Sequence, residues 1–250
     1  MEKSNVFSKF PKSKIYVFGK DDPYRVKKLE AIDIAFYRFA TECYTKKLNV
    51  IFKGGCLIRH IFRSFDKINI RKTKDLDFDM CEEAYLIMSE EWENIRFSRL
   101  RSDLKSNAVL FDGGYDCDIQ VLTEVDWESC SIYNCSEGKF YGARIEDILS
   151  DKIISASGKY ITKRVKDLVD IANLITTEKI INSIDFTLLL KFISRKNIGN
   201  FEVFYTEKEQ IRKELQDFHV KPDEVYRVIS LFLEGVFEGK ISGWTGSVWL

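Results

Sequence analysis

The sequence predicts an α+β protein, in which a first half that mixes helices and strands precedes a C-terminal helical bundle. Strand-like alternation and turn signals are confined to the part before about residue 145, and helical periods follow one another after it. No Gly/Ser-rich linker and no repeat separates the two parts. We therefore expect two domains that pack together, residues 1–145 and residues 146–250.

The composition is typical of a soluble globular protein. The 250 residues are 45% apolar and 31% charged, and 39 basic residues balance 39 acidic ones, so net charge gives no argument for a nucleic-acid partner. The six cysteines form no C-x-x-C, which favours buried thiols in a reducing compartment over a zinc site. Because neither an apolar signal core nor an apolar run of membrane-spanning length occurs, we expect a cytoplasmic protein with no membrane partner.

Periodicity and turn signals predict the elements of the first half in order. After a surface arm at 1–24 they are a helix at 24–47, a buried strand at 49–52, a helix at 56–65, an alternating strand at 75–80, a helix at 90–104 and a hairpin at 107–125. The hairpin is expected because Asp-Gly-Gly between two strand-like runs is a strong turn signal.

Five helical periods make up the second half. They cover 145–157, 164–175, 185–195, 207–218 and 222–237. Pro222 stands where the last helix begins, in the first turn that proline favours. We expect the tail, which carries Trp244 and Trp249, to pack its aromatic rings on the bundle.

The alternating segment TKDLDFDM, residues 73–80, places Asp75, Asp77 and Asp79 on one face of a strand. Leu76, Phe78 and Met80 fill the other face, which should point to the core. Carboxylates two residues apart lie about 6.5–7 Å from each other, so they repel unless water, a lysine or a divalent cation compensates. A calcium-binding EF-hand loop is excluded, because its required Gly and Glu positions hold Met80 and Leu86.

Gly54 and Gly55 lie between the predicted strand at 49–52 and the helix that follows. A Gly-Gly step there exposes backbone amides at a helix N-terminus, where they can hold a phosphate. The surrounding residues form neither a Walker loop nor a dinucleotide fingerprint.

The order strand, Gly-Gly, helix and D-x-D strand resembles the nucleotidyltransferase fold of the polymerase-beta superfamily. Within it, the chain resembles the AbiEii-type (MenT-like) toxin nucleotidyltransferases. The first motif is carried by Lys53, Gly54, Gly55, Leu57, Arg71, Thr73, Asp75, Leu76, Asp77 and Phe78. The second is carried by Glu146, Lys152, Arg164, Lys166, Asp167 and Asp170. Cys56 departs from the usual threonine, and Gly55 stands where many members of the superfamily have serine, so backbone amides alone would hold a phosphate.

The resemblance implies a two-metal nucleotidyltransferase that uses Mg²⁺ or Mn²⁺ and a nucleoside triphosphate. The implied metal ligands are Asp75, Asp77 and a third carboxylate, for which we choose Asp118 because its strand continues through Ile119 and Val121 to the core. Asp116 is expected to be solvated, and Asp79 to lie at the rim.

The implied catalytic residues are Asp75, Asp77, Lys152 and Asp167, and the implied nucleotide-binding residues are Lys53, Gly54, Gly55 and Lys152. Lys152 would place positive charge against the triphosphate, and Asp167 would orient Lys152 or help to deprotonate the acceptor. Without the resemblance, Lys152 would be a solvent-facing helix lysine and Asp167 an ordinary ion-pair partner of Lys163.

The family implies RNA, including tRNA ends, as the acceptor and a cognate antitoxin as a partner. Two basic stretches, 67–74 and 159–166, would attract phosphates. Two other hypotheses stay open: a non-catalytic descendant that binds nucleotide or a partner protein, and a small-molecule nucleotidyltransferase. His60 and His219 have no recognisable partner and are expected to be at least half exposed, with no catalytic role.

Overall fold

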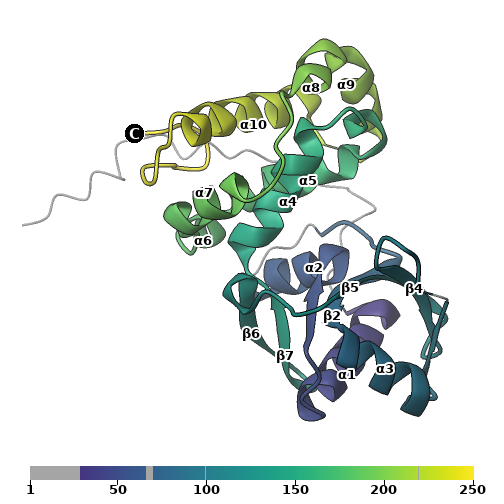
Figure 1. Cartoon of the computed structure of the whole chain (residues 1–250). Helices are drawn as coiled ribbons and strands as arrows, with labels where there is room; N and C mark the ends of the chain where they lie inside the picture. The colour runs from purple at the N-terminus through teal and green to yellow at the C-terminus, as the bar shows by residue number, and fades with distance from the viewer. Residues whose placement is uncertain (1–28, 66–69, 99, 219) are drawn as a thin grey trace, which may run out of the picture.

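In the computed structural model of the chain, residues 29–65, 70–98, 100–218 and 220–250 are described, and they form seven strands and ten α-helices (Figure 1). The predicted surface arm at 1–24, Lys67 of the first basic stretch, and His219 lie outside the described residues. Across the part that is described, no helix combines the length and the apolar character that a membrane span requires.

The strands form one mixed sheet in the order β3-β4-β5-β2-β1-β7-β6. Their bounds are β1 (Val50–Lys53), β2 (Asp75–Cys81), β3 (Ile95–Phe97), β4 (Lys105–Leu110), β5 (Tyr115–Leu122), β6 (Cys130–Cys135) and β7 (Gly138–Ala143). Strand β2 lies in the middle, antiparallel to β1 and parallel to β5. The predicted α+β class is confirmed, with a mixed sheet flanked by helices and followed by a helical part.

One face of the sheet carries the aromatic core. Helices α1 (Ala31–Thr45) and α2 (Gly54–Ser64) pack on this face, and Phe36 of α1 meets Phe52 of β1 and Phe140 of β7 edge to face. Leu76, Phe78 and Met80 of β2 are completely buried, as the alternation predicts. The carboxylates between them therefore lie on the opposite face of β2.

The helix predicted at 90–104 is wrong. Helix α3 (Glu82–Glu91) ends where that helix should begin, and β3 follows it at the edge of the sheet. Ile95 of β3 pairs with Leu110 of β4, and Trp92 packs edge to face on Phe39 of α1. Cross-strand hydrogen bonds and burial at the sheet edge outweigh the local helical preference of this segment.

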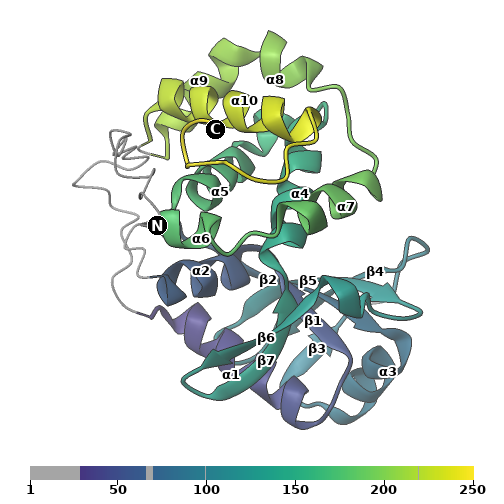
Figure 2. The same cartoon turned by 90° about the vertical axis from the view of Figure 1, so that its left-hand side faces the viewer.

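Among the described residues of the second half no strand forms, as predicted, and seven α-helices follow one another. They are α4 (Ile145–Ser157), α5 (Val165–Thr176), α6 (Glu178–Ile181), α7 (Phe186–Ser194), α8 (Glu202–Thr206), α9 (Lys208–Gln216) and α10 (Pro222–Phe237). Figure 2 shows these helices gathered on one side of the sheet-bearing half. Pro222 occupies the first turn of α10 as predicted, whereas α6 and α8 were not predicted. The domain division between residues 145 and 146 stays a prediction.

The C-terminal tail packs on the bundle, as expected from its tryptophans. Trp244 donates a hydrogen bond from Nε1 to the carbonyl of Ile175 at 2.7 Å, and Trp249 stacks on Phe232. All six cysteines are free thiols, and five of them are buried, as predicted from their apolar neighbours.

His60 is buried, so the prediction of an exposed or half-exposed histidine is wrong. Its ring meets Phe140 edge to face, and its Nδ1 lies 3.0 Å from the hydroxyl of Tyr37. Burial, reinforced by the charge of Arg63, lowers the pKa of His60 to about 4. The imidazole is thus a neutral member of the aromatic core at physiological pH.

Replacing His60 by glutamine should remove part of the pH dependence of stability. The unfolded chain protonates this imidazole below its ordinary pKa of 6.5, whereas the native protein does so only near 4. The unfolded state therefore binds the extra proton first, and this one group should lower the free energy of unfolding by about 2 kcal/mol between pH 7 and pH 5. Urea denaturation of the wild type and His60→Gln at both pH values measures the difference. Equal losses in the two proteins would contradict the assignment.

Candidate active site

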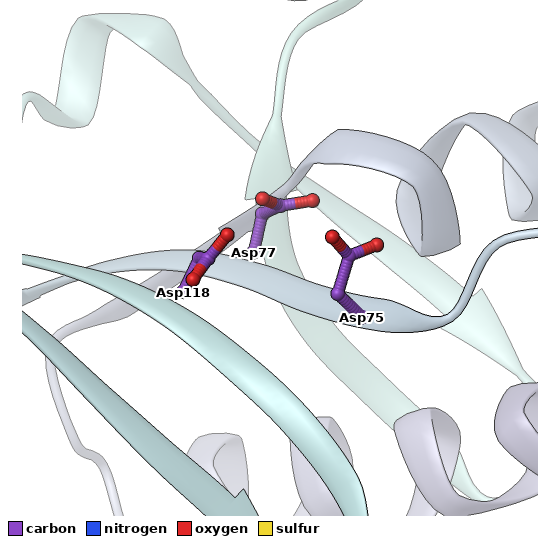
Figure 3. A group of neighbouring side chains, drawn as sticks. All are labelled: Asp75, Asp77 and Asp118. Carbon is purple, nitrogen blue, oxygen red and sulfur yellow. The ribbon is translucent and has the colours of Figure 1, made fainter. Parts of the chain in front are cut away.

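Three carboxylates meet on the open face of the sheet. Asp75 and Asp77 lie on β2, and Asp118 lies on β5, directly opposite Asp77 in the parallel register. One oxygen atom from each residue can be chosen so that all three atoms lie within 4.8 Å of one another. Figure 3 shows the three side chains projecting from the same side of their strands. The structure thus brings together Asp75, Asp77 and Asp118, the three residues predicted as metal ligands.

The charges of this triad are mutually repulsive. Burial raises the pKa of Asp77 above its ordinary value, and the neighbouring charges of Asp75 and Asp118 raise it further. A cation placed among the three oxygens would relieve this repulsion. Hard carboxylate oxygens are the ligands that Mg²⁺ and Mn²⁺ prefer, so the donor set fits the metal that the sequence implies.

Gly54 and Gly55 allow the start of α2 to approach the triad. A Cβ atom on Gly54 would lie 1.8 Å from Oδ2 of Asp77, and the φ of Gly54 is +66°. A Cβ atom on Gly55 would lie 2.3 Å from Oγ1 of Thr73. The amide of Gly55 donates a hydrogen bond to Oδ2 of Asp77 at 3.4 Å. In this structure the Gly-Gly step therefore supports a carboxylate, and its predicted role with phosphate stays a prediction.

Asp75 is positioned by two residues to which the sequence reasoning gave no role. The hydroxyl of Thr73 donates to Oδ1 of Asp75 at 3.0 Å, and the thiol of Cys56 donates to the backbone carbonyl of Asp75 at 3.5 Å. The contact of Thr73 with Asp75 could have been predicted from sequence, because residues two apart in an extended segment lie on the same face. The contact of Cys56 depends on the packing of α2 and has no local signal.

A cluster of five charges lies beside the triad, and four of its members are buried, whereas the side chain of Arg164 is 51% exposed. The ammonium of Lys152 lies 2.5 Å from Oδ1 of Asp167 and 3.1 Å from Oδ2 of Asp170. Arg71 donates two hydrogen bonds of 2.8 Å to Asp170, and Arg164 donates one of 2.7 Å to Asp167. Because three cations surround two carboxylates, this cluster, which we call the Asp170 cluster, carries one excess positive charge.

The surroundings of Lys152 and Asp167 differ from those that their local sequence alone predicts. Lys152 is buried, not exposed to solvent, and Asp167 pairs with it and with Arg164 instead of Lys163. Asp167 is completely buried, and both of its oxygens already accept hydrogen bonds from cations. It is therefore suited to orient Lys152 and poorly suited to take a proton from an acceptor.

Asp170 and Lys152 of the Asp170 cluster both remain charged at neutral pH. Burial raises the pKa of Asp170, but Arg71 and Lys152 outweigh it and hold the pKa below its ordinary value. Burial similarly lowers the pKa of Lys152, and the carboxylates of Asp170 and Asp167 outweigh it and raise the pKa. The cluster can therefore present a fixed positive charge to a bound anion.

A second group of charges lies beside the first half of α4. The ammonium of Lys53, a predicted nucleotide-binding group, pairs with Asp79. Close by, Lys196 pairs with Asp147 at 2.7 Å and Asp151 at 2.6 Å. The i, i+4 spacing of Asp147 and Asp151 places both on one face of α4, but nothing in the sequence identifies Lys196 as their partner.

One cavity of about 150 Å³ joins these groups. It is lined by Lys53, Gly54, Gly55, Arg71, Thr73, Asp75, Asp77, Ile148, Asp151, Lys152, Ser155, Arg164 and Lys166. The cavity thus contains two of the three carboxylates of the triad and several cations, which come from both the sheet-bearing half and the helical half. This arrangement can hold a divalent cation next to an anionic group.

Glu146 does not line this cavity, although it belongs to the second motif. Its carboxylate accepts a hydrogen bond from the amide of Asp185 at 2.8 Å. It lines a separate, open cavity of about 530 Å³ together with His60 and Arg144. Glu146 therefore fixes the start of α7 and has no contact with the triad.

The basic side chains of the two stretches differ in their exposure to solvent. Arg71 is buried and paired with Asp170, so it is not available to a nucleic acid. The exposed lysines of the two stretches are Lys72, Lys74, Lys159, Lys163 and Lys166. Together with the exposed Arg164, which is paired with Asp167, these are the described basic side chains of the two stretches that an external polyanion could reach.

No protein-family model matches the chain, and no curated protein matches it in sequence. Among solved structures it is similar to JHP933 from Helicobacter pylori, with a TM-score of 0.47, 12% identity, and coverage of 85% of this chain and 97% of that chain. It is also similar to ANT(2″)-Ia in complex with adenylyl-2″-tobramycin, with a TM-score of 0.45, 16% identity, and coverage of 66% and 99%. A third similar structure is the nucleotidyltransferase toxin MenT4 from Mycobacterium tuberculosis H37Rv, with a TM-score of 0.41, 14% identity, and coverage of 65% and 62%.

Gly54→Ala should weaken metal binding by more than the backbone strain of an alanine with a positive φ would cause. The new methyl group would overlap the carboxylate of Asp77, so either that side chain or the start of α2 must move. We expect Mn²⁺ affinity, measured by electron paramagnetic resonance, to fall by about tenfold or more. Gly114→Ala is the matched control, because Gly114 also has a positive φ, +68°, but has open space around its Cβ position. Equal effects of the two substitutions would contradict the steric explanation.

Asp170→Asn should strongly destabilise the fold. The substitution leaves Arg71 and Lys152 buried beside a neutral amide, and breaking a buried ion cluster in this way costs about 3–5 kcal/mol. Asp223→Asn removes an exposed partner of Arg212 and should cost less than about 1 kcal/mol. Urea denaturation compares the two variants, and a similarly small loss in both would show that Asp170 does not stabilise the buried cluster.

Proposed function

We propose that the protein is a metal-dependent nucleotidyltransferase, which moves a nucleoside monophosphate from a nucleoside triphosphate to an acceptor hydroxyl. The observation that carries the proposal is that two carboxylates of a convergent triad line one cavity together with several cations. A metal–triphosphate complex has the complementary charges, because its cation meets the carboxylates and its phosphates meet the cations. The two motifs of the sequence support the same activity.

In this reaction the acceptor oxygen forms a bond to the α-phosphorus, and the bond from that phosphorus to the bridging oxygen breaks. Its electron pair leaves with pyrophosphate, and the hydroxyl proton passes to solvent. Bound Mg²⁺ or Mn²⁺ would lower the cost of the charge that develops on the phosphate and acceptor oxygens.

Each residue of the site has a proposed task. Asp75, Asp77 and Asp118 would hold the metal, and Thr73 keeps Asp75 oriented. Lys152 supplies fixed positive charge near the phosphates, and Asp167 fixes the position of its ammonium.

We propose RNA, including tRNA ends, as the acceptor to test first. Exposed lysines in 72–74 and 159–163 flank residues that line the cavity, and they would attract a phosphate backbone. A toxin–antitoxin setting is proposed from the motif resemblance, and growth arrest on expression would be its cellular readout.

Transfer can be measured with α-³²P-labelled ATP, GTP, CTP and UTP, Mg²⁺ or Mn²⁺, and total RNA. We expect label in RNA, with a loss of roughly 100-fold or more in Asp77→Asn and Asp118→Asn, because even outer-shell partners of a metal contribute 10–100-fold. Asp116→Asn is the matched control, since Asp116 lies on the same strand as Asp118 but outside the triad.

The other outcomes separate the remaining hypotheses. Label in a small hydroxyl compound but not in RNA would identify a small-molecule transferase. Nucleotide binding without transfer to any acceptor would identify a non-catalytic descendant of the fold. Equal activity of Asp116→Asn and Asp118→Asn would contradict the assignment of the triad.

A further inference from the structure

The cavity contains a cation that the described part of the protein leaves without a partner. Lys53, Arg71, Lys152 and Arg164 each form an ion pair with a carboxylate. Lys166 also lines the cavity and is exposed, yet among the described residues its ammonium has no hydrogen bond or ion pair. An unpaired cation on the wall of a cavity is free to bind an anion without first breaking an internal contact.

The position of Lys166 has no explanation in the stability of its own helix. It lies in the first turn of α5, between the buried residues Val165 and Asp167. The helix dipole disfavours a cation in this turn, and Arg164 is a further positive charge two residues away. A ligand with negative charge would offset both unfavourable terms.

The charges along the cavity also give it a direction. Ile148, Asp151, Lys152 and Ser155 of α4 line it at the i, i+3, i+4, i+7 spacing of one helix face. Near the start of α4, Lys53 and Lys196 are outnumbered by Asp79, Asp147 and Asp151. Around α5, the Asp170 cluster and Lys166 together contain four cations and two carboxylates. The excess positive charge is therefore concentrated at the α5 end.

We propose that Lys166 binds the terminal phosphate of the nucleoside triphosphate, so that the phosphate tail points to the first turn of α5 and the nucleoside lies toward Ile148 and Asp151. This inference rests on the proposed function. Lys152 is held by two carboxylates inside the Asp170 cluster and acts as a fixed charge, whereas Lys166 can follow the phosphate. The protein would then distinguish a triphosphate from a diphosphate through one flexible side chain.

The test is a comparison of triphosphate and diphosphate binding in the absence of any acceptor. Isothermal titration calorimetry with Mg²⁺ and ATP, GTP, CTP and UTP first identifies the nucleotide that binds best, and its diphosphate is then titrated. We expect the wild type to prefer the triphosphate by about tenfold, as for one charge-assisted contact, and Lys166→Gln to lose this preference. Lys166→Arg should keep most of it.

Lys213→Gln is the matched control, because Lys213 is an exposed lysine of α9 outside the cavity and the change in net charge is the same. Its preference should equal that of the wild type. Circular dichroism melting verifies that all variants remain folded.

Three results would overturn the inference. A full triphosphate preference in Lys166→Gln, or an equal loss of affinity for triphosphate and diphosphate, would show that Lys166 does not bind the terminal phosphate, and the proposed function would stand. A wild type that binds none of the four triphosphates would overturn the inference and the proposed function together.

Discussion

Asp170 is completely buried, and its carboxylate is shared by Arg71, from the segment before β2, and Lys152, from α4. A buried carboxylate is unfavourable unless cations and hydrogen bonds compensate it, so these three side chains must be placed together or the interior is destabilised. The requirement joins the helical half to the strand that carries Asp75 and Asp77. Much of the candidate site follows from it, since the position of Lys152 over the sheet is set by the same contact.

The triad depends on a second constraint, the close approach of α2 to β2. Gly54 and Gly55 have no side chains, so the first turn of the helix can lie against Asp77 and Thr73. The apolar partners Leu76 and Phe78 fix the other face of the strand in the aromatic core. Carboxylates that repel one another are therefore held by an anchored strand and a rigid turn, which is the kind of support that a metal site needs.

Much of this architecture could be predicted from sequence, because its signals are local. The alternation in 75–80 and the five helical periods after residue 145 are properties of neighbouring residues, and the structure confirms them. The helix predicted at 90–104 was wrong because edge pairing with β4 decides that segment. The burial of His60 depends on Tyr37 and Phe140, which are distant in sequence.

The contacts of the charged site likewise differ in how far they could be predicted from sequence. Strand parity predicts that the carboxylates of β2 and β5 share a face, but it applies equally to Asp79 and Asp116. The register of the two strands, which places Asp118 opposite Asp77, selects the triad. The partners of Asp167 and Asp170 could be predicted only in part, because Arg71 is supplied from 99 residues earlier in the chain. For Lys196 and Glu146, tertiary packing alone determines which groups they contact.

The parallel pairing of β2 with β5 has a consequence for the newly made chain. Asp75 and Asp77 are synthesised first, Asp118 comes 43 positions after Asp75 and 41 after Asp77, and Asp170 completes the cluster with Arg71 across a separation of 99 residues. Such non-local contacts form late in folding, because a long loop must close before any of them is gained. A ribosome-bound fragment that ends before α5 would possess all three carboxylates of the triad. It would lack Asp167 and Asp170, the two carboxylates that hold Arg71 and Lys152. The triad and the Asp170 cluster would therefore be complete together only after α5 has been synthesised and docked.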